Sequence, residues 1–268
     1  MPRKPRIFIG VGGWTYEPWR GSFYPESLPQ KRELEYMSRA LTSIEINGTY
    51  YGSQKPESFI KWREETPEDF VFSVKGPRFA TNRRVLAESG ESIERFFGSG
   101  VLELKDKLGP INWQFMATKK FDAEDFAKFL ALLPKEIGGR TIRNAIEVRH
   151  DSFRSPEFLA LAREHGVAVV IAGDSEFPQI ADVTADFVYA RIMGTKEKPK
   201  IGYPAKTLDQ WAERAQIWAE GDTPNDLETI SPKAAKTPRD VFLYVISGFK
   251  EHNPHAAIAL IERAEKKI

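Results

Sequence analysis

The alternation of short apolar segments with amphipathic ones constrains this chain more than any other feature of its sequence. Eight segments are rich in β-branched and aromatic residues and have the length of strands. They lie at 7–14, 43–51, 70–76, 111–116, 144–150, 168–174, 187–194 and 241–248. Between most of them the sequence has helical periodicity, at 31–40, 56–65, 91–104, 122–133, 155–165, 207–220 and 253–266. Strands that alternate with helices predict a parallel sheet.

Eight such units in 268 residues predict one closed (β/α)8 barrel, the TIM-barrel architecture. We interpret residues 1–268 as a single domain, because the composition does not change along the chain in a way that marks a boundary. The alternative is an open doubly wound sheet. That fold usually has a glycine-rich phosphate loop after its first strand, and GVGGW (10–14) is not followed by a helix start in the expected place. Two segments interrupt the alternation, 195–206 and 221–240, and we expect both to be surface loops.

Composition and charge exclude several classes of protein. Lys and Arg number 39 and Asp and Glu number 38, so the net charge of +1 predicts neither nucleic-acid nor membrane binding. The absence of cysteine rules out disulfides, thiolate metal sites and cysteine nucleophiles. The sequence also lacks an apolar segment of membrane-spanning length and the pattern of a signal peptide. We therefore expect a cytoplasmic protein without a membrane partner, and the sequence favours no particular oligomeric state.

Nearly every predicted strand has a polar residue near its carboxyl end, where barrel enzymes place their chemistry. Glu45 and Asn47 lie two residues apart in the second predicted strand, so they point to the same face. Buried polar groups are costly unless they are paired, and a network of ion pairs that serves packing alone is the simplest alternative. Because the set draws on at least five strands, we expect it to line a ligand site. Its members are Glu45, Asn47, Lys75, Gln114, Glu147, Arg149, Asp174 and Arg191.

The cations in this set predict a small anionic or phosphorylated ligand. Lys75, Arg149 and Arg191 would hold the anion through charge-assisted hydrogen bonds. Trp14 and Tyr51 belong to a group of aromatic residues in the first two loops and would wall the pocket. The sequence thus predicts one pocket at the carboxyl ends of the strands.

Glu45 and Glu147 are the candidate catalytic residues. Either would act as a general base, oriented by Asn47 and Gln114. Two carboxylates also suit glycoside hydrolysis when their separation is right. Nearby cations favour the ionised form of both, however, which argues against a general acid. Whether the chain is an enzyme stays open, with hydrolysis and isomerisation as the two reaction classes.

The sequence predicts no cofactor. Glu45, Glu147, Asp174 and His150 include the oxygen and imidazole ligands that metals prefer, so a divalent metal stays an open alternative. Their spacing does not single out a metal site, and we predict none.

Nucleic-acid binding is a second hypothesis for the same end of the barrel. Basic residues follow the third and seventh predicted strands, and aromatic residues crowd the first two loops. Cations with aromatic platforms suit phosphate contacts and base stacking, and such binding weakens steeply with salt. The basic residues are Arg78, Arg83, Arg84, Lys196, Lys198, Lys200 and Lys206. A third hypothesis is a non-catalytic scaffold.

Motifs spread over most of the chain resemble those of the YecE-like family, also called domain of unknown function 72. They are IGVGGWTYEPWRGSFYP (9–25), SIEINGTYY (43–51), FVFSVKGPRFAT (70–81), KLGPINWQF (107–115), EVRHDSF (147–153) and YARIMG (189–194). The resemblance implies a TIM barrel whose function is not established. That barrel is similar to those of xylose isomerase and endonuclease IV, which implies sugar or nucleic-acid substrates by fold analogy alone.

The chain departs from that family at several motif positions. The family often has histidines where this chain has Asn82 and Met193, a tryptophan near Phe153, and a Phe-Asn-Asn type motif where this chain has VISG (245–248). The resemblance therefore implies that two histidines able to bind a ligand or transfer a proton are absent here. This argues against metal-dependent hydrolysis.

Overall fold

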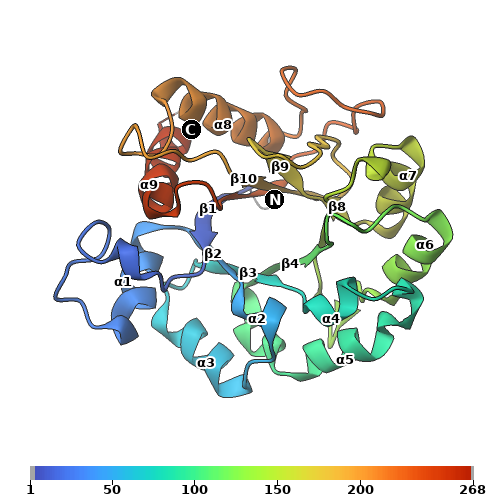
Figure 1. Cartoon of the computed structure of the whole chain (residues 1–268), viewed down its shortest axis with the longest axis horizontal. Coiled ribbons are helices and arrows are strands. Elements are labelled where there is room, and N and C mark those ends of the chain that lie inside the picture. The colour runs from blue at the N-terminus through green and yellow to red at the C-terminus, as the bar shows by residue number, and fades with distance from the viewer. Residues whose placement is uncertain (1–3, 267–268) are drawn as a thin grey trace.

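Parallel strands form the central sheet of the computed structural model, which describes residues 4–266 (Figure 1). Its strands are β1 (Ile7–Gly12), β2 (Ser43–Ile46), β3 (Val71–Lys75), β4 (Leu108–Gln114), β7 (Asn144–Glu147), β8 (Ala168–Val169), β9 (Ile171–Gly173), β10 (Phe187–Ile192) and β11 (Asp240–Val245). Their order across the sheet is β8-β7-β4-β3-β2-β1-β11-β10-β9.

The sheet closes on itself through β8 and β9, which are two halves of the predicted sixth strand. Only Val170 separates them, and its amide donates to the carbonyl of Ile146 at 2.9 Å. Because β8 pairs with β7 and β9 pairs with β10, the two ends of the strand order meet at this residue. All eight predicted strands are therefore present, and the predicted (β/α)8 TIM-like barrel is confirmed.

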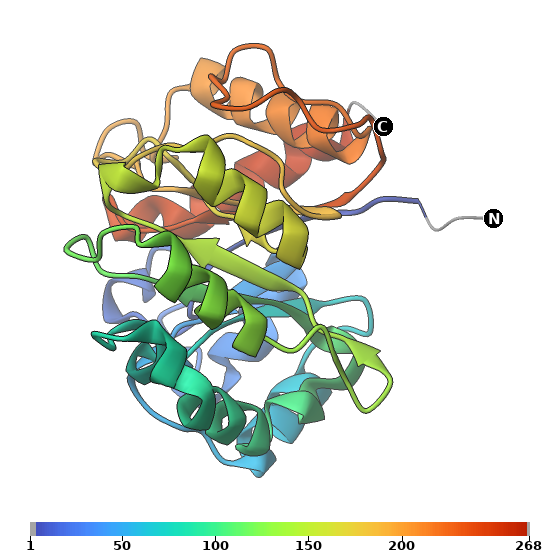
Figure 2. The same cartoon turned by 90° about the vertical axis from the view of Figure 1, so that its right-hand side faces the viewer.

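Helices surround the outer face of the sheet (Figures 1 and 2). The longer ones match the predicted helices: α1 (Glu33–Ala40), α3 (Pro56–Glu65), α5 (Gly90–Gly98), α6 (Ala123–Leu132), α7 (Pro156–His165), α8 (Ala205–Ala219) and α9 (Asn253–Glu265). Local signals in the sequence explain several of their ends. Asp122 and Ser155 are N-caps whose side chains accept hydrogen bonds from the amides of Asp125 and Phe158. Gly166 ends α7 with a φ of 66°, in the left-handed region that glycine tolerates.

Shorter elements occupy the connections. A hairpin of β5 (Glu136–Ile137) and β6 (Arg140–Thr141) precedes β7, and the four-residue helices α2 (Gly48–Tyr51) and α4 (Arg78–Thr81) follow β2 and β3. The 3-10 turns are η1 (Glu17–Trp19), η2 (Gln30–Arg32), η3 (Leu86–Ser89), η4 (Val101–Lys107), η5 (Asp151–Phe153) and η6 (Lys250–His252). Within residues 4–266, none of the helices has both the length and the apolar character needed to cross a membrane.

The second strand is shorter than the sequence predicts. A strand was expected over 43–51, but β2 ends at Ile46 and the next residues form α2. Asn47 already has helical backbone angles, with φ −92° and ψ −21°. The β propensity of Tyr50 and Tyr51 is overridden because the chain must leave the sheet here to reach α3. Both tyrosines therefore lie on a helical turn above the barrel.

Side chains of the strands alternate between two buried clusters. Outward-facing ones, such as Val11, Ile44 and Trp113, pack beneath the helices. Inward-facing ones fill the barrel with aromatic rings, among them Phe8, Phe187, Tyr189, Phe242 and Tyr244. The amino-terminal half of the barrel is therefore a packed core, and polar side chains gather above it.

The two segments predicted as surface loops contain little regular structure. Helix α8 begins at Ala205 and β11 at Asp240, so each segment overlaps an element only at its end. The second segment contacts the body of the barrel: Asp182 accepts hydrogen bonds from the amides of Ile230 and Ser231, both at 2.9 Å. Such contacts hold the excursion against the loop that precedes β10.

Candidate functional site

Glu45 and Glu147 lie inside the barrel and share one arginine. Glu45 is on β2, Glu147 ends β7, and both are completely buried. Arg191 of β10 donates to Glu45 Oε1 at 3.0 Å and to Glu147 Oε2 at 2.6 Å. Its own side chain is only 3% exposed. This guanidinium thus joins three strands, none of which is next to another in the sheet.

The remaining carboxylate oxygens are also satisfied. Tyr189 donates its hydroxyl to Glu45 Oε2 at 2.6 Å. Asn112 Nδ2 lies 3.2 Å from Glu147 Oε2 and 3.4 Å from Glu45 Oε2. Arg149 donates to Glu147 Oε1 from Nε at 2.9 Å and from Nη2 at 2.6 Å. All four carboxylate oxygens therefore accept at least one hydrogen bond, as buried charges require. We call Glu45, Glu147, Arg191, Arg149, Asn112 and Tyr189 the carboxylate network.

The carboxylate network keeps Glu147 ionised. Burial by itself would raise the pKa of this carboxyl group, but the charges of Arg191, Arg149 and Lys75 outweigh it and lower the pKa to about 2. At neutral pH, Glu147 is therefore a paired anion of low basicity. A general base works best with a pKa near the working pH, so this environment suits a positioning role better than proton abstraction.

Lys75 differs from the two arginines in its partners. It ends β3, and its residue is 6% exposed. Its ammonium donates to the side-chain carbonyl of Gln114 and lies 4.4 Å from the centroid of the Tyr50 ring. Neither carboxylate of the network forms a salt bridge with it in residues 4–266. Burial and then repulsion by Arg191 lower the pKa of Lys75 to about 8, against the opposing attraction of the carboxylates.

The charges of the carboxylate network and Lys75, taken together, do not balance. Glu45 and Glu147 provide two negative charges, whereas Arg149, Arg191 and protonated Lys75 provide three positive ones. Both terminal nitrogens of Arg191 are occupied by carboxylates. Arg149 is 21% exposed and leaves Nη1 without a partner within the described residues, while its guanidinium lies 4.2 Å from the centroid of the Phe177 ring. The excess positive charge is therefore presented by Lys75 and Arg149.

Strand register brings Lys75 and Arg149 to the same stretch of the rim. Lys75 pairs with Asn112 across β3 and β4, and Gln114 pairs with Glu147 across β4 and β7. Arg149 follows Glu147 by two residues, which in an extended chain is the same face. The two cations thus come from the ends of β3 and β7, with Gln114 of β4 between them. We call Lys75, Gln114 and Arg149, with the rings of Tyr50 and Phe177, the cation site.

Two predicted site residues lie outside this arrangement. Trp14 packs edge-on against Trp62 of α3, with ring centroids 5.1 Å apart, and against the outward-facing Phe72. It therefore belongs to the layer between sheet and helices. Asp174 has a φ of 53°, is exposed, and accepts a hydrogen bond from Trp211 Nε1 of α8 at 2.8 Å. The left-handed turn at the end of β9 accompanies this contact with the helix layer.

Asn47 and Tyr51 lie at the mouth of the barrel around α2. The carboxamide of Asn47 sits against Gly12, where a Cβ atom would come within 2.5 Å of Asn47 Nδ2. Tyr51 is 64% exposed and stands edge-on to Tyr50 at 5.1 Å. Asn47 thus stays near the interior, whereas Tyr51 faces solvent close to the guanidinium of Arg78, which is 5.7 Å from its ring.

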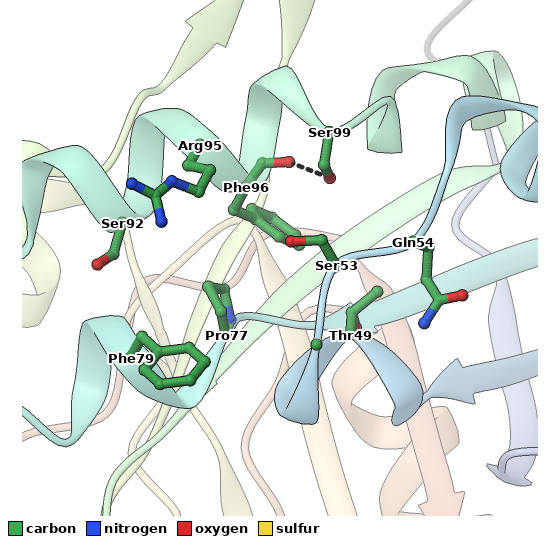
Figure 3. Close-up of a pocket in the computed structure, with 10 residues that line it drawn as sticks. Thr49, Ser53, Gln54, Pro77, Phe79, Ser92, Arg95, Phe96 and Ser99 are labelled. Atoms are coloured by element: carbon green, nitrogen blue, oxygen red, sulfur yellow. Dashed lines mark hydrogen bonds between the residues drawn. The ribbon is translucent and has the colours of Figure 1, made fainter.

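Cavities at two other places in the molecule have linings that do not include Lys75, Gln114 or Arg149. One of about 120 Å³ is enclosed by α2, α4 and α5, and its lining includes Thr49, Gln54, Phe79 and Arg95 (Figure 3). Thr49 also donates its hydroxyl to the backbone carbonyl of Lys75 at 2.7 Å, so this cavity adjoins the cation site. A larger one, of about 560 Å³, lies at the opposite end of the barrel beside β1, α8 and α9. Within residues 4–266, no three acidic or histidine side chains are placed to hold a metal ion.

Sequence reasoning missed four residues of these two clusters. Asn112 and Tyr189 each stand two residues before a predicted site residue on the same strand, so period-two alternation was a usable signal for both. Tyr50 and Phe177 come from a helical turn and a loop, and their positions over Lys75 and Arg149 depend on tertiary structure.

Comparison of the sequence with models of protein families identifies the family of this chain. A family model described as "Protein of unknown function DUF72" matches residues 8–268. The chain belongs to the DUF72 family. The sequence resemblance to the YecE-like family is thereby confirmed.

Curated relatives match part of the chain. It is 28% identical over 161 residues to UPF0759 protein YecE of Escherichia coli K12, which covers 59% of this chain and 52% of YecE. It is also 28% identical over 157 residues to UPF0759 protein YunF of Bacillus subtilis 168, covering 57% of this chain and 54% of YunF. The matched stretch thus spans about half the length of these relatives.

A solved DUF72 structure has the same fold over nearly the whole chain. The crystal structure of a DUF72 family protein from Thermotoga maritima superposes with a TM-score of 0.72 at 21% identity, covering 98% of this chain and 99% of that one. Likeness at this level of identity shows the fold alone. The function of this DUF72 protein has to be argued from its own side chains.

Proposed function

We propose that this DUF72 protein binds a small anionic ligand, with a carboxylate or phosphate group, at the cation site. The observation that carries the proposal is the buried ammonium of Lys75. Its partners are the Gln114 carbonyl and the face of Tyr50, neither of which bears a negative charge. A buried charge without a counter-charge in contact is costly, and an anionic ligand would supply that direct partner. The free Nη1 of Arg149 would donate a second charge-assisted hydrogen bond.

The carboxylate network supports this site from below. Glu147 fixes the guanidinium of Arg149 through two hydrogen bonds, and Arg191 fixes Glu147 in turn. In this proposal Arg191, Glu45 and Glu147 are positioning residues. If the bound ligand is hydrolysed or isomerised, proton transfer near neutral pH fits Lys75, with a pKa of about 8, better than Glu147, with a pKa of about 2.

Thermal stability in the presence of small anions tests the proposal. The panel contains inorganic phosphate, pyruvate and sugar phosphates, each at low and high salt. A ligand at about 100 times its dissociation constant should add roughly 2.7 kcal/mol of stability. We expect stabilisation of the wild type and its loss in Lys75→Met, which keeps most of the side-chain volume but removes the charge.

Lys250→Met is the matched control. Lys250 also lies over aromatic rings, 4.2 Å from Tyr16 and 5.5 Å from Trp19, but it is outside the cation site. This variant should respond to anions as the wild type does. Equal responses of the two variants, or a wild type that no anion stabilises, would contradict the proposal and favour a non-catalytic scaffold.

Nucleic-acid binding is a second candidate, favoured by an exposed aromatic pair at the same end of the barrel. Tyr51 and Phe79 are 64% and 60% exposed, and the guanidinium of Arg78 lies 5.7 Å and 5.6 Å from their ring centroids. Exposed rings beside an arginine suit stacking of unpaired bases. Fluorescence anisotropy with short single-stranded oligonucleotides at several salt concentrations tests it. Binding that Tyr51→Ala and Phe79→Ala leave unchanged would count against this surface.

A further inference from the structure

We propose that Lys75 is a covalent catalytic group that forms an imine with a small carbonyl compound bearing a carboxylate or phosphate. The inference rests on the proposed function, because it places an anionic compound at the cation site. Here the acidic group is held by Arg149, so that Lys75 contacts the carbonyl group instead of forming an ion pair. It goes further in naming the reacting atom, the bond formed and the chemical class of the substrate.

The first support is the fixed position of the amine. Lys75 ends a barrel strand, and its backbone carbonyl accepts a hydrogen bond from Thr49 of α2 at 2.7 Å. Its Nζ is held between the Gln114 carbonyl and the Tyr50 ring. Holding a nucleophile in place before the substrate binds lowers the activation barrier, because the entropy of positioning is lost in advance. The lysine therefore points to one location at the carboxyl ends of β3 and β4.

The second support is the absence of an ion pair. Lysines locked in salt bridges stay protonated and lack the lone pair that attacks carbon. Among residues 4–266, Lys75 has neutral partners, and it is repelled by the neighbouring guanidinium groups of Arg191 and Arg149. Burial and neighbouring cations are the means by which enzymes activate amine nucleophiles. With its pKa at about 8, roughly a tenth of the amine is neutral at pH 7.

The third support is a nearby anchor for an acid group. Arg149 is partly exposed, retains a free Nη1, and is held by Glu147 and by the ring of Phe177. It stands two strands from Lys75, with neighbouring strands about 4.8 Å apart, a span that two long side chains bridge. A compound whose carbonyl carbon lies a few bonds from its acid group can contact both residues.

The chemical step balances without a further reactant. The neutral amine attacks the carbonyl carbon and forms a C–N bond, while the carbonyl oxygen takes up a proton to give a carbinolamine. The hydroxyl then leaves as water when the C=N bond forms. In sum, the ammonium form of Lys75 and the carbonyl compound yield a protonated imine and one water molecule. The carboxylates of Glu45 and Glu147, which attract the ammonium, would attract the imine cation equally.

Reductive trapping tests the proposal on the full-length protein. Wild-type protein is incubated with pyruvate or with dihydroxyacetone phosphate, reduced with sodium borohydride, and analysed by intact mass and peptide mapping. Acetone and dihydroxyacetone are the matched carbonyl compounds without an acid group. We expect one reduced adduct on Lys75 with the acidic compounds, at least several-fold more than with the neutral ones, and more at pH 8 than at pH 6. Which acidic compound is trapped distinguishes carboxylate from phosphate.

Two variants check the assignment. Lys75→Arg should abolish the adduct, and Lys250→Arg should retain it, although burial lowers the pKa of Lys250 as well. Because peptide mapping of the wild type already locates the modified lysine, the result does not depend on the folding of either variant. Adducts spread over exposed lysines, or none on Lys75, would overturn the proposal.

The outcomes also separate this proposal from the proposed function. Stabilisation by pyruvate or phosphate without trapping would leave the anion site standing and overturn the imine. Equal trapping of acidic and neutral compounds, with no stabilisation by anions, would keep Lys75 as a nucleophile and overturn the anion site.

Discussion

The two ends of the barrel interior differ in how their charged side chains are paired. At the amino-terminal end, the guanidinium of Arg143 and the backbone amide of Arg6 both donate to Asp240, and the two guanidinium groups lie over the rings of Phe187 and Phe8. Cations, a carboxylate and aromatic rings together close that end. At the carboxyl end, polar side chains replace the rings, and Lys75 has no carboxylate in contact within the described residues. The amino-terminal end is closed by paired and stacked side chains, whereas the carboxyl end contains Lys75 as a cation without a carboxylate in contact among residues 4–266.

This difference separates structural charge from charge that is placed for a ligand. A cation that is paired and stacked serves the fold, while a buried cation with neutral partners lowers the stability of the free protein. Residues that lower stability in this way are kept where function requires them. The contrast predicts that removing a paired cation destabilises the free protein, whereas removing Lys75 stabilises it.

The largest effect is expected from Arg191→Met, which removes the shared partner of Glu45 and Glu147. Breaking a buried pair by removing one member costs about 3–5 kcal/mol, because the other charge stays buried without compensation. The free energy of unfolding, measured with urea, should fall by that amount. Arg143→Met at the opposite end should cost about 1 kcal/mol, since that side chain is 31% exposed. Equal losses in the two variants would contradict the expectation that Arg191, which two buried carboxylates share, contributes more than the partly exposed Arg143.

The pH dependence of stability should reflect Glu147. Its pKa in the folded protein, about 2, lies below that of the unfolded chain, so its contribution is present above about pH 4.3 and is lost as the pH falls toward 2. The loss should amount to about 3 kcal/mol. Urea titrations from pH 5 to pH 2.5 should show a shallower decline in Glu147→Gln than in the wild type. Parallel curves would show that Glu147 is not held ionised.

Lys75→Met should stabilise the protein without ligand, in contrast to removal of any paired cation. Replacing a buried charge that has no counter-charge in contact by an apolar side chain of similar size is expected to add about 1–2 kcal/mol at pH 7. For the wild type, the lowered pKa of Lys75 means that stability should rise as the pH increases from 8 toward 10.5. Thermal unfolding at pH 7 and pH 9 measures both effects. Destabilisation by Lys75→Met would show that the ammonium serves packing.

The smallest effect is expected from Tyr51→Ala. This side chain is largely exposed, and substitutions at such positions usually change stability by less than about 0.5 kcal/mol. Anion binding at the cation site should also be unaffected, because Tyr51 faces solvent beyond Tyr50. Urea unfolding and the anion panel check this together. A loss of anion stabilisation would place Tyr51 in the pocket wall, as the sequence analysis expected.

Local pattern alone determined a large part of the structure. Alternation of apolar and polar residues is a property of neighbouring positions, so it predicted the eight strands, most of the helices and the inward direction of Glu45, Lys75, Gln114, Glu147 and Arg191. Capping residues such as Ser155 are local too, and they explain where helices such as α7 begin. The prediction was wrong where a local preference competes with the path of the chain. Residues 47–51 were predicted as strand, but they leave the sheet, and Gly48–Tyr51 form α2.

Which charges meet was decided by the tertiary structure. Strand order and barrel closure bring Arg191 across the interior to Glu45 and Glu147, over sequence separations of 146 and 44 residues. The same closure leaves Lys75 beside Gln114 and Tyr50 instead of a carboxylate. A sequence shows that three cations and several carboxylates face inward, but pairing depends on distances of a few ångströms between distant segments. The excess cation, on which both functional proposals rest, exists only because of those distances.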